Sequence, residues 1–143
     1  MIFDLSDKQA VWFDLPDGGR IQLKSPSVSD VLRIEKQSTE NRPYLHAPLN
    51  DKGERLPPRI LNHEVPDLDK RARLYNDCTI IAWEGIIDAN GKIIPCTPEM
   101  KTALMRLKDT AFRDFVNEKL KLLDEASKDK AEEEVKNSLA WIS

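Results

Sequence analysis

The sequence predicts a predominantly helical α+β domain, with an N-terminal β-hairpin and a short second hairpin packed on about four helices. Three observations lead to this fold class. Residues 9–24 alternate apolar and polar side chains around a turn, later segments repeat apolar residues at helical spacing, and a capping residue precedes each of those segments. At 143 residues the chain is large enough for one domain with its own core, which we place at 1–126.

The N-terminal hairpin is predicted over residues 9–24. Side chains alternate along 11–15 and again along 21–23, and the sequence Pro-Asp-Gly-Gly at 16–19 turns the chain between them. A two-stranded hairpin is marginal in water by itself. We therefore expect its apolar face to rest on helices or to join a further strand.

Helices are predicted at 26–37, 67–84, 98–106 and from about 109 to 126. Between the second and third of these helices, two pairs of isoleucines flank the dipeptide Asn90-Gly91, which favours a short second hairpin. The helices are expected to supply the core through these residues: Val31, Leu32, Tyr75, Ile81, Phe112, Phe115 and Leu120.

Two segments lack a clear structural pattern. Residues 38–66 contain five prolines and both histidines without a sustained period, which predicts a long and mobile loop. Residues 127–143 are expected to form a charged helical tail with an apolar tip, because acidic residues dominate its first half and large apolar residues return near its end. Such a tail docks loosely or awaits a partner chain.

Composition excludes several classes of partner. The net charge is −3 and the isoelectric point is near 5.5, which gives no electrostatic reason to bind nucleic acid or an anionic membrane. The sequence has no apolar run long enough to span a bilayer, and its first residues lack the pattern of a secretory signal. We therefore expect a cytoplasmic protein in which Cys78 and Cys96 are reduced.

The sequence predicts no catalytic residue, no cofactor site and no metal site. An EF-hand loop with Gly91 at its sixth position would begin at Ile86 and end at Thr97, and neither residue supplies the carboxylate required there. The two histidines have no cysteine or histidine at metal-ligand spacing. One enzymatic alternative stays open, a small metal-dependent hydrolase whose site assembles from residues distant in sequence: Glu84, Asp88, His46 and His63.

Aromatic and apolar residues instead suggest contact with other proteins. Trp12 lies opposite its apolar neighbours on the predicted strand, Trp83 ends a predicted helix, and Trp141 lies near the C-terminus. Tryptophan is enriched where proteins bind each other. The predicted partner-binding residues are therefore Trp12, Trp83, Leu139, Trp141 and Ile142.

The middle of the chain resembles the tail assembly chaperones of long-tailed bacteriophages and prophages. The resemblance rests on Ala-Trp-Glu-Gly-Ile at 82–86, on Asp88-x-x-Gly91, and on Ile-Pro followed by the helix-opening Thr-Pro-Glu at 94–99. The segment LPDGGRIQLKSPSVSDVLRI at 15–34 is similar to the hairpin and first helix of such proteins. Together these parts cover about two-thirds of the chain, and 38–66 and the tail have no matched counterpart.

This resemblance implies a non-catalytic assembly factor in the host cytoplasm. Family members bind the long tape-measure protein and help to recruit tail tube protein around it. Coating an elongated client requires a reversible apolar surface that self-association can multiply, so a homo-oligomer is a further expectation. Many are made together with a longer frameshifted form. The alternative within the same setting is another small structural or completion protein of the tail.

Overall fold

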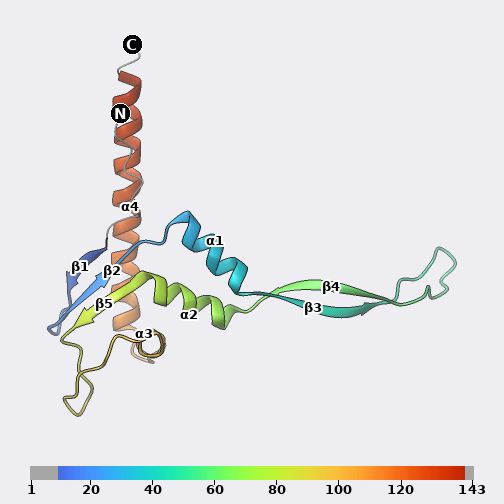
Figure 1. Cartoon of the computed structure of the whole chain (residues 1–143), viewed down its shortest axis with the longest axis horizontal. Helices are drawn as coiled ribbons and strands as arrows, with labels where there is room; N and C mark the ends of the chain where they lie inside the picture. The colour runs from blue at the N-terminus through green and yellow to red at the C-terminus, as the bar shows by residue number, and fades with distance from the viewer. Residues whose placement is uncertain (1–9, 141–143) are drawn as a thin grey trace.

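The computed structural model describes residues 10–140, with side chains described as far as residue 126. It is an α+β structure whose described residues form four helices and five strands, and the strands lie in two antiparallel sheets. The expectation of a predominantly helical fold is therefore wrong. Figure 1 shows a small body from which a long β-hairpin projects to one side and helix α4 rises in another direction.

The body contains a three-stranded antiparallel sheet with the order β1-β2-β5. β1 (Val11–Asp14) and β2 (Arg20–Leu23) form the expected hairpin, and β5 (Ile80–Glu84) pairs with the other edge of β2. Gly19 lies so close to β5 that an added Cβ would come within 2.6 Å of the Glu84 carbonyl oxygen. Its φ of +83° also favours glycine, so both the turn and the sheet contact require this residue.

The second predicted helix, at 67–84, divides into a helix and a strand. α2 (Leu68–Thr79) begins at the N-cap Asp67, and the chain then extends as β5. The run Thr79-Ile80-Ile81 is β-branched, which disfavours helix and favours strand. A continued helix would also leave the second edge of β2 unpaired, so pairing with a distant segment decides the structure of 80–84.

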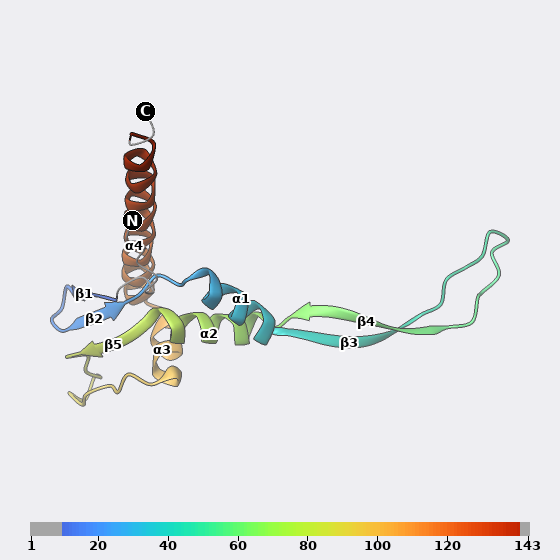
Figure 2. The same cartoon turned by 45° about the horizontal axis from the view of Figure 1, so that its top comes forward.

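The segment 38–66, expected to be a loop, forms an antiparallel two-stranded hairpin. β3 (Thr39–His46) and β4 (Arg59–Pro66) pair along their whole length, and an isolated bridge joins Leu49 to Arg55 near the tip. We call residues 39–66 the arm. Figures 1 and 2 show it projecting from the ends of α1 and α2, away from the three-stranded sheet.

Three other helices complete the fold. α1 (Val28–Gln37) begins at a capping box in which Ser27 and Asp30 exchange hydrogen bonds, and α3 (Pro98–Met105) begins at the N-cap Thr97. α4 (Ala111–Ala140) continues without a break through the segment predicted as a charged tail. The predicted second hairpin is reduced to a turn with one isolated bridge, between Ile87 and Ile93.

The core is small and lies between the three-stranded sheet, α3 and α4. Its buried residues are Ile21, Leu23, Ile80, Trp83, Met105, Val116 and Leu120. Of the residues predicted for the core, Leu120 is buried, and Phe112 and Phe115 pack partly buried against it.

The other four predicted core residues are exposed, so that part of the prediction is wrong. Val31 and Leu32 on α1, Tyr75 on α2 and Ile81 on β5 are each more than a third accessible to solvent. For the three helix residues the physical reason is that no further described layer covers the outer side of α1 and α2. Their apolar spacing reflects a surface rather than a core. Ile81 lies at the irregularity in the β2–β5 register, between the pairs Gln22–Ala82 and Leu23–Ile80.

Candidate interaction surface

The two histidines lie on the arm, next to one tyrosine. His46 and His63 occupy β3 and β4, and both rings meet Tyr44 edge-on, with centroids 6.4 and 5.9 Å from that of the tyrosine. The register places all three side chains on one face of the hairpin, because cross-strand and alternate neighbours share a face.

The two carboxylates of the enzymatic alternative lie elsewhere, each with its own partner. Glu84 on β5 accepts a hydrogen bond from the Arg20 guanidinium at 2.7 Å, and this contact lowers the pKa of the Glu84 carboxyl. Asp88 accepts backbone N–H groups of Asn90 and Lys92 and thereby shapes the turn. Within the described part of the chain, no group of three or more His, Cys, Asp or Glu residues is placed to hold a metal ion.

Neither described cysteine is activated as a nucleophile. Cys78 and Cys96 are free thiols of intermediate burial. Burial raises the pKa of both thiols, and the Asp30 carboxyl raises that of Cys78 further. The thiolate is the reactive form, so both residues are predominantly protonated near neutral pH.

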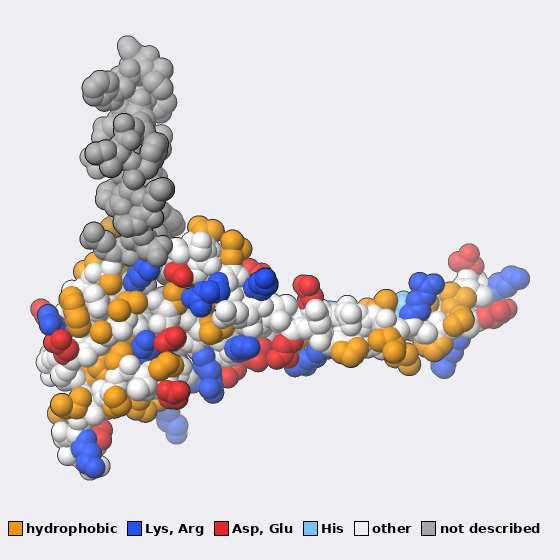
Figure 3. Space-filling model, viewed as in Figure 1, with side chains coloured by type: hydrophobic (Ala, Val, Ile, Leu, Met, Phe, Trp, Pro, Cys, Tyr) orange, Lys and Arg blue, Asp and Glu red, His pale blue; other side chains and the backbone are white. Residues whose placement is uncertain are grey.

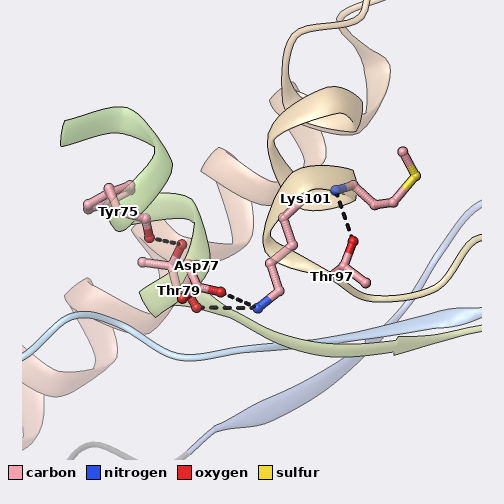
Figure 4. A network of polar contacts seen from close by, with 6 residues as sticks. Tyr75, Asp77, Thr79, Thr97 and Lys101 are labelled. Atoms are coloured by element: carbon pink, nitrogen blue, oxygen red, sulfur yellow. Dashed lines mark hydrogen bonds and ion pairs between the residues drawn. The ribbon is translucent and has the colours of Figure 1, made fainter. Parts of the chain in front are cut away.

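The polar network between α2 and α3 has a structural role (Figure 4). The buried Lys101 ammonium donates to the Asp77 carboxylate at 3.0 Å and also contacts the Asp77 carbonyl. Nearby, Thr79 donates to the Tyr75 carbonyl, and Thr97 accepts the N-cap hydrogen bond of α3. Each polar group here joins or ends a helix.

Of the predicted partner-binding tryptophans, Trp83 is not at the surface. It is 7% exposed, its indole N–H donates to the Ile94 carbonyl at 2.8 Å, and its ring meets Phe112 edge-on. The expectation that Trp83 lies at the surface is therefore wrong, since β5 turns this side chain into the core.

Trp12 lies at the surface, on the edge strand β1. It is 36% exposed, and the Arg20 guanidinium stacks over its ring at 4.3 Å. Its role in partner binding stays a prediction. The side chain of Leu139 falls outside the described part of α4, and Trp141 and Ile142 lie outside the described residues.

The main surface feature is apolar. Among the residues whose side chains are described, large hydrophobic side chains that are exposed outnumber those that are buried. One group follows one face of α1, at positions 28, 31 and 32, and we call it the α1 stripe. A second group lies on α2, at Leu68 and Tyr75. The third group lies on the arm: Tyr44, Leu45, Leu49, Leu56, Ile60 and Leu61.

Figure 3 shows apolar side chains along the arm and over the body, interspersed with charges of both signs. Exposed apolar patches commonly mark interaction sites. The arm was missed by sequence reasoning, although one signal was present. Asn50 begins a turn that ends at Gly53, and leucines lie on both sides of it, at 49 and 56.

Comparison with known proteins adds no family. The chain matches no protein-family model, no curated protein and no solved structure. In the described part of the chain, none of the helices combines the length and apolar character needed to cross a membrane.

Proposed function

We propose that this protein is a phage or prophage tail assembly chaperone, which binds the tape-measure protein by contact and helps to recruit tail tube protein around it. The observation that supports the proposal is the exposed apolar surface of α1, α2 and the arm. A chaperone of this kind needs an accessible apolar surface that binds reversibly to an aggregation-prone chain. The motifs at 82–99 that resemble the family are the second support.

The α1 stripe is the part of this surface most suited to an elongated client. Val28 and Leu32 are one helical turn apart and are 77% and 60% exposed. The charged residues Asp30, Arg33 and Lys36 of the same helix keep it solvated around the stripe. An apolar segment of a client would bury the stripe without displacing any core residue.

Co-expression with the tape-measure protein tests the proposal. The double variant Val28→Gln and Leu32→Gln removes the two most exposed side chains of the stripe while keeping good helix formers. The matched control is Ile87→Gln with Ile93→Gln, since these residues are 59% and 78% exposed but lie in the turn after β5. We expect the wild type and the control to keep the tape-measure protein soluble and the stripe variant to lose that effect. A wild-type chain that leaves the tape-measure protein insoluble would refute the proposal.

A further inference from the structure

The arm has two long edges, and only β3–β4 pairing satisfies its backbone among the described residues. Figures 1 and 2 show from two directions that the arm stands away from the body. A two-stranded hairpin is marginal in water, and three or more strands are generally needed for a stable sheet. Unpaired edges are also templates for further strands. An additional strand from another chain would therefore stabilise the arm.

The hydrogen-bond pattern shows which backbone groups face outward. Asp67 N–H donates to the Ser38 carbonyl at 2.7 Å, so this pair, at the base of the arm, is a hydrogen-bonded pair. Such pairs alternate along an antiparallel ladder. With the observed register, the outward-facing residues are therefore Thr39, Asn41, Pro43 and Leu45 on β3, and Ile60, Asn62, Glu64 and Pro66 on β4.

The two edges differ in their ability to accept a new strand. Pro43 lies in the middle of the outward set of β3 and has no N–H to donate. On β4, in contrast, the proline Pro66 lies at the end of the strand next to the body, and the run from Arg59 to Val65 contains no proline. The three outward residues within this run each have both a donor and an acceptor. The β4 edge is the open one.

We propose that two copies of this chain pair β4 with β4 in antiparallel orientation, forming a four-stranded sheet with Asn62 on the two-fold axis. This inference rests on the arm alone and does not depend on the proposed function. In the register that centres on Asn62, Ile60 of each copy lies opposite Glu64 of the other copy, and the two Asn62 residues lie opposite each other. The three outward residues of each proline-free run are all used, which gives about six backbone hydrogen bonds.

Neighbouring registers are less favourable. A two-fold axis at Leu61 brings Arg59 opposite His63 of the second copy and leaves Glu64 opposite Pro58, which has no N–H. A two-fold axis at Ile60 places Asn62 opposite Pro58 of the second copy, so a hydrogen bond is lost there too. Only the Asn62 register uses the whole proline-free run.

Charge on the other face supports the same register. Arg59 then lies opposite Val65 of the second copy, and Val65 is the cross-strand neighbour of Glu40. The arginine side chain is long enough to reach across the valine to that Glu40. Within the arm Glu40 contacts Arg42 at 3.6 Å, and its side chain is half-exposed, so it is accessible for this pair. The two-fold axis produces the contact twice.

A single cysteine on the axis tests the proposal. In the Asn62 register, the two copies of Asn62→Cys would have Cα atoms about 5.5 Å apart, within disulfide range. The control is Asn41→Cys, which lies on the same face of the arm but on β3, at the outer edge of the four-stranded sheet. The wild type, with its native Cys78 and Cys96, gives the baseline.

Under mild oxidation we expect Asn62→Cys to form a reducible covalent dimer, while Asn41→Cys and the wild type stay at baseline. Equal crosslinking of the two variants would overturn the proposal, as would an Asn62→Cys variant that stays monomeric. The second outcome would also indicate that the β4 edge serves a different occupant, such as an extended segment of a client.

A charge exchange tests the register independently, by sedimentation equilibrium. Arg59→Glu and Glu40→Arg should each weaken dimerisation by about fivefold, because two exposed ion pairs are lost. The double variant restores the pairs in reversed order and should recover most of that affinity. A wild type that is monomeric at all concentrations, or a double variant weaker than both single variants, would contradict the proposal. Neither result bears on whether the α1 stripe keeps the tape-measure protein soluble.

Discussion

Truncation of Trp83 should be among the most destabilising single changes in this chain. The residue is only 7% exposed, and it packs in the core with Ile21, Ile80 and Val116. Core Trp→Ala substitutions cost about 3–5 kcal/mol of unfolding free energy, through lost burial and the cavity that remains. We expect a cost in that range for Trp83→Ala.

Two further variants separate the contributions. Trp83→Phe keeps an aromatic ring against Phe112 but removes the donor to the Ile94 carbonyl, which should cost about 1–3 kcal/mol. Trp12→Ala is the surface comparison. It loses a partly exposed ring and the stacking of Arg20, which should cost about 1 kcal/mol.

Urea unfolding followed by circular dichroism measures all three variants. The midpoints should fall in the order wild type, Trp12→Ala, Trp83→Phe, Trp83→Ala, with similar slopes. If Trp83→Ala were no more destabilising than Trp12→Ala, Trp83 would not belong to the core, and the pairing of β5 with β2 would be placed in doubt.

Three other predictions follow from local contacts. Gly19→Ala should lower the free energy of unfolding by clearly more than Gly18→Ala in the same urea assay. Both glycines have positive φ, but only at Gly19 would the added Cβ lie against Glu84. Equal losses of unfolding free energy in the two variants would contradict this contact. The difference in unfolding free energy between wild type and Asp30→Asn should have its whole value above pH 3.8 and shrink as the pH falls below 3.8. The reason is that hydrogen bonds from Ser27 lower the pKa of Asp30 in the folded state. A difference that does not change with pH would refute this. Alkylation of Cys78 and Cys96 at pH 8 should be slower than that of free cysteine, because burial raises the pKa of both thiols. Unfolding in urea should remove this difference in rate. Labelling of the folded protein as fast as that of free cysteine would contradict the prediction.

Local sequence signals located most of the body. The hairpin at 11–23 follows from alternation and a glycine-rich turn, and the N-caps Asp67 and Thr97 mark the starts of two helices. These features depend on neighbours in sequence, which a single chain displays directly.

Non-local pairing explains the failures. Ile80–Glu84 continues the apolar period of a helix, yet it forms a strand because it pairs with the free edge of β2. Conversely, α1 has the apolar spacing of a core helix, yet Val28 and Leu32 face solvent because no described element covers them. Periodicity reports that a face is apolar, and it does not report what lies against that face.

The arm was missed for a related reason. Both of its faces are exposed, so neither strand shows the alternation of a half-buried sheet, and its prolines suggested a loop. Pro43 is compatible with β3 because it lies at an outward position, where its missing N–H breaks no hydrogen bond within the hairpin. Whether the arm is mobile stays a prediction.

Side-chain footprinting of the complex with the tape-measure protein tests most directly whether this chain works through its exposed apolar surface. Hydroxyl radicals oxidise accessible Leu and Tyr side chains, and Leu32, Leu68 and Tyr75 are exposed in the free protein. We expect oxidation of these residues to fall in the complex, while that of Ile93 in the turn stays unchanged. A stable complex in which all of them remain as reactive as in the free protein would contradict the account.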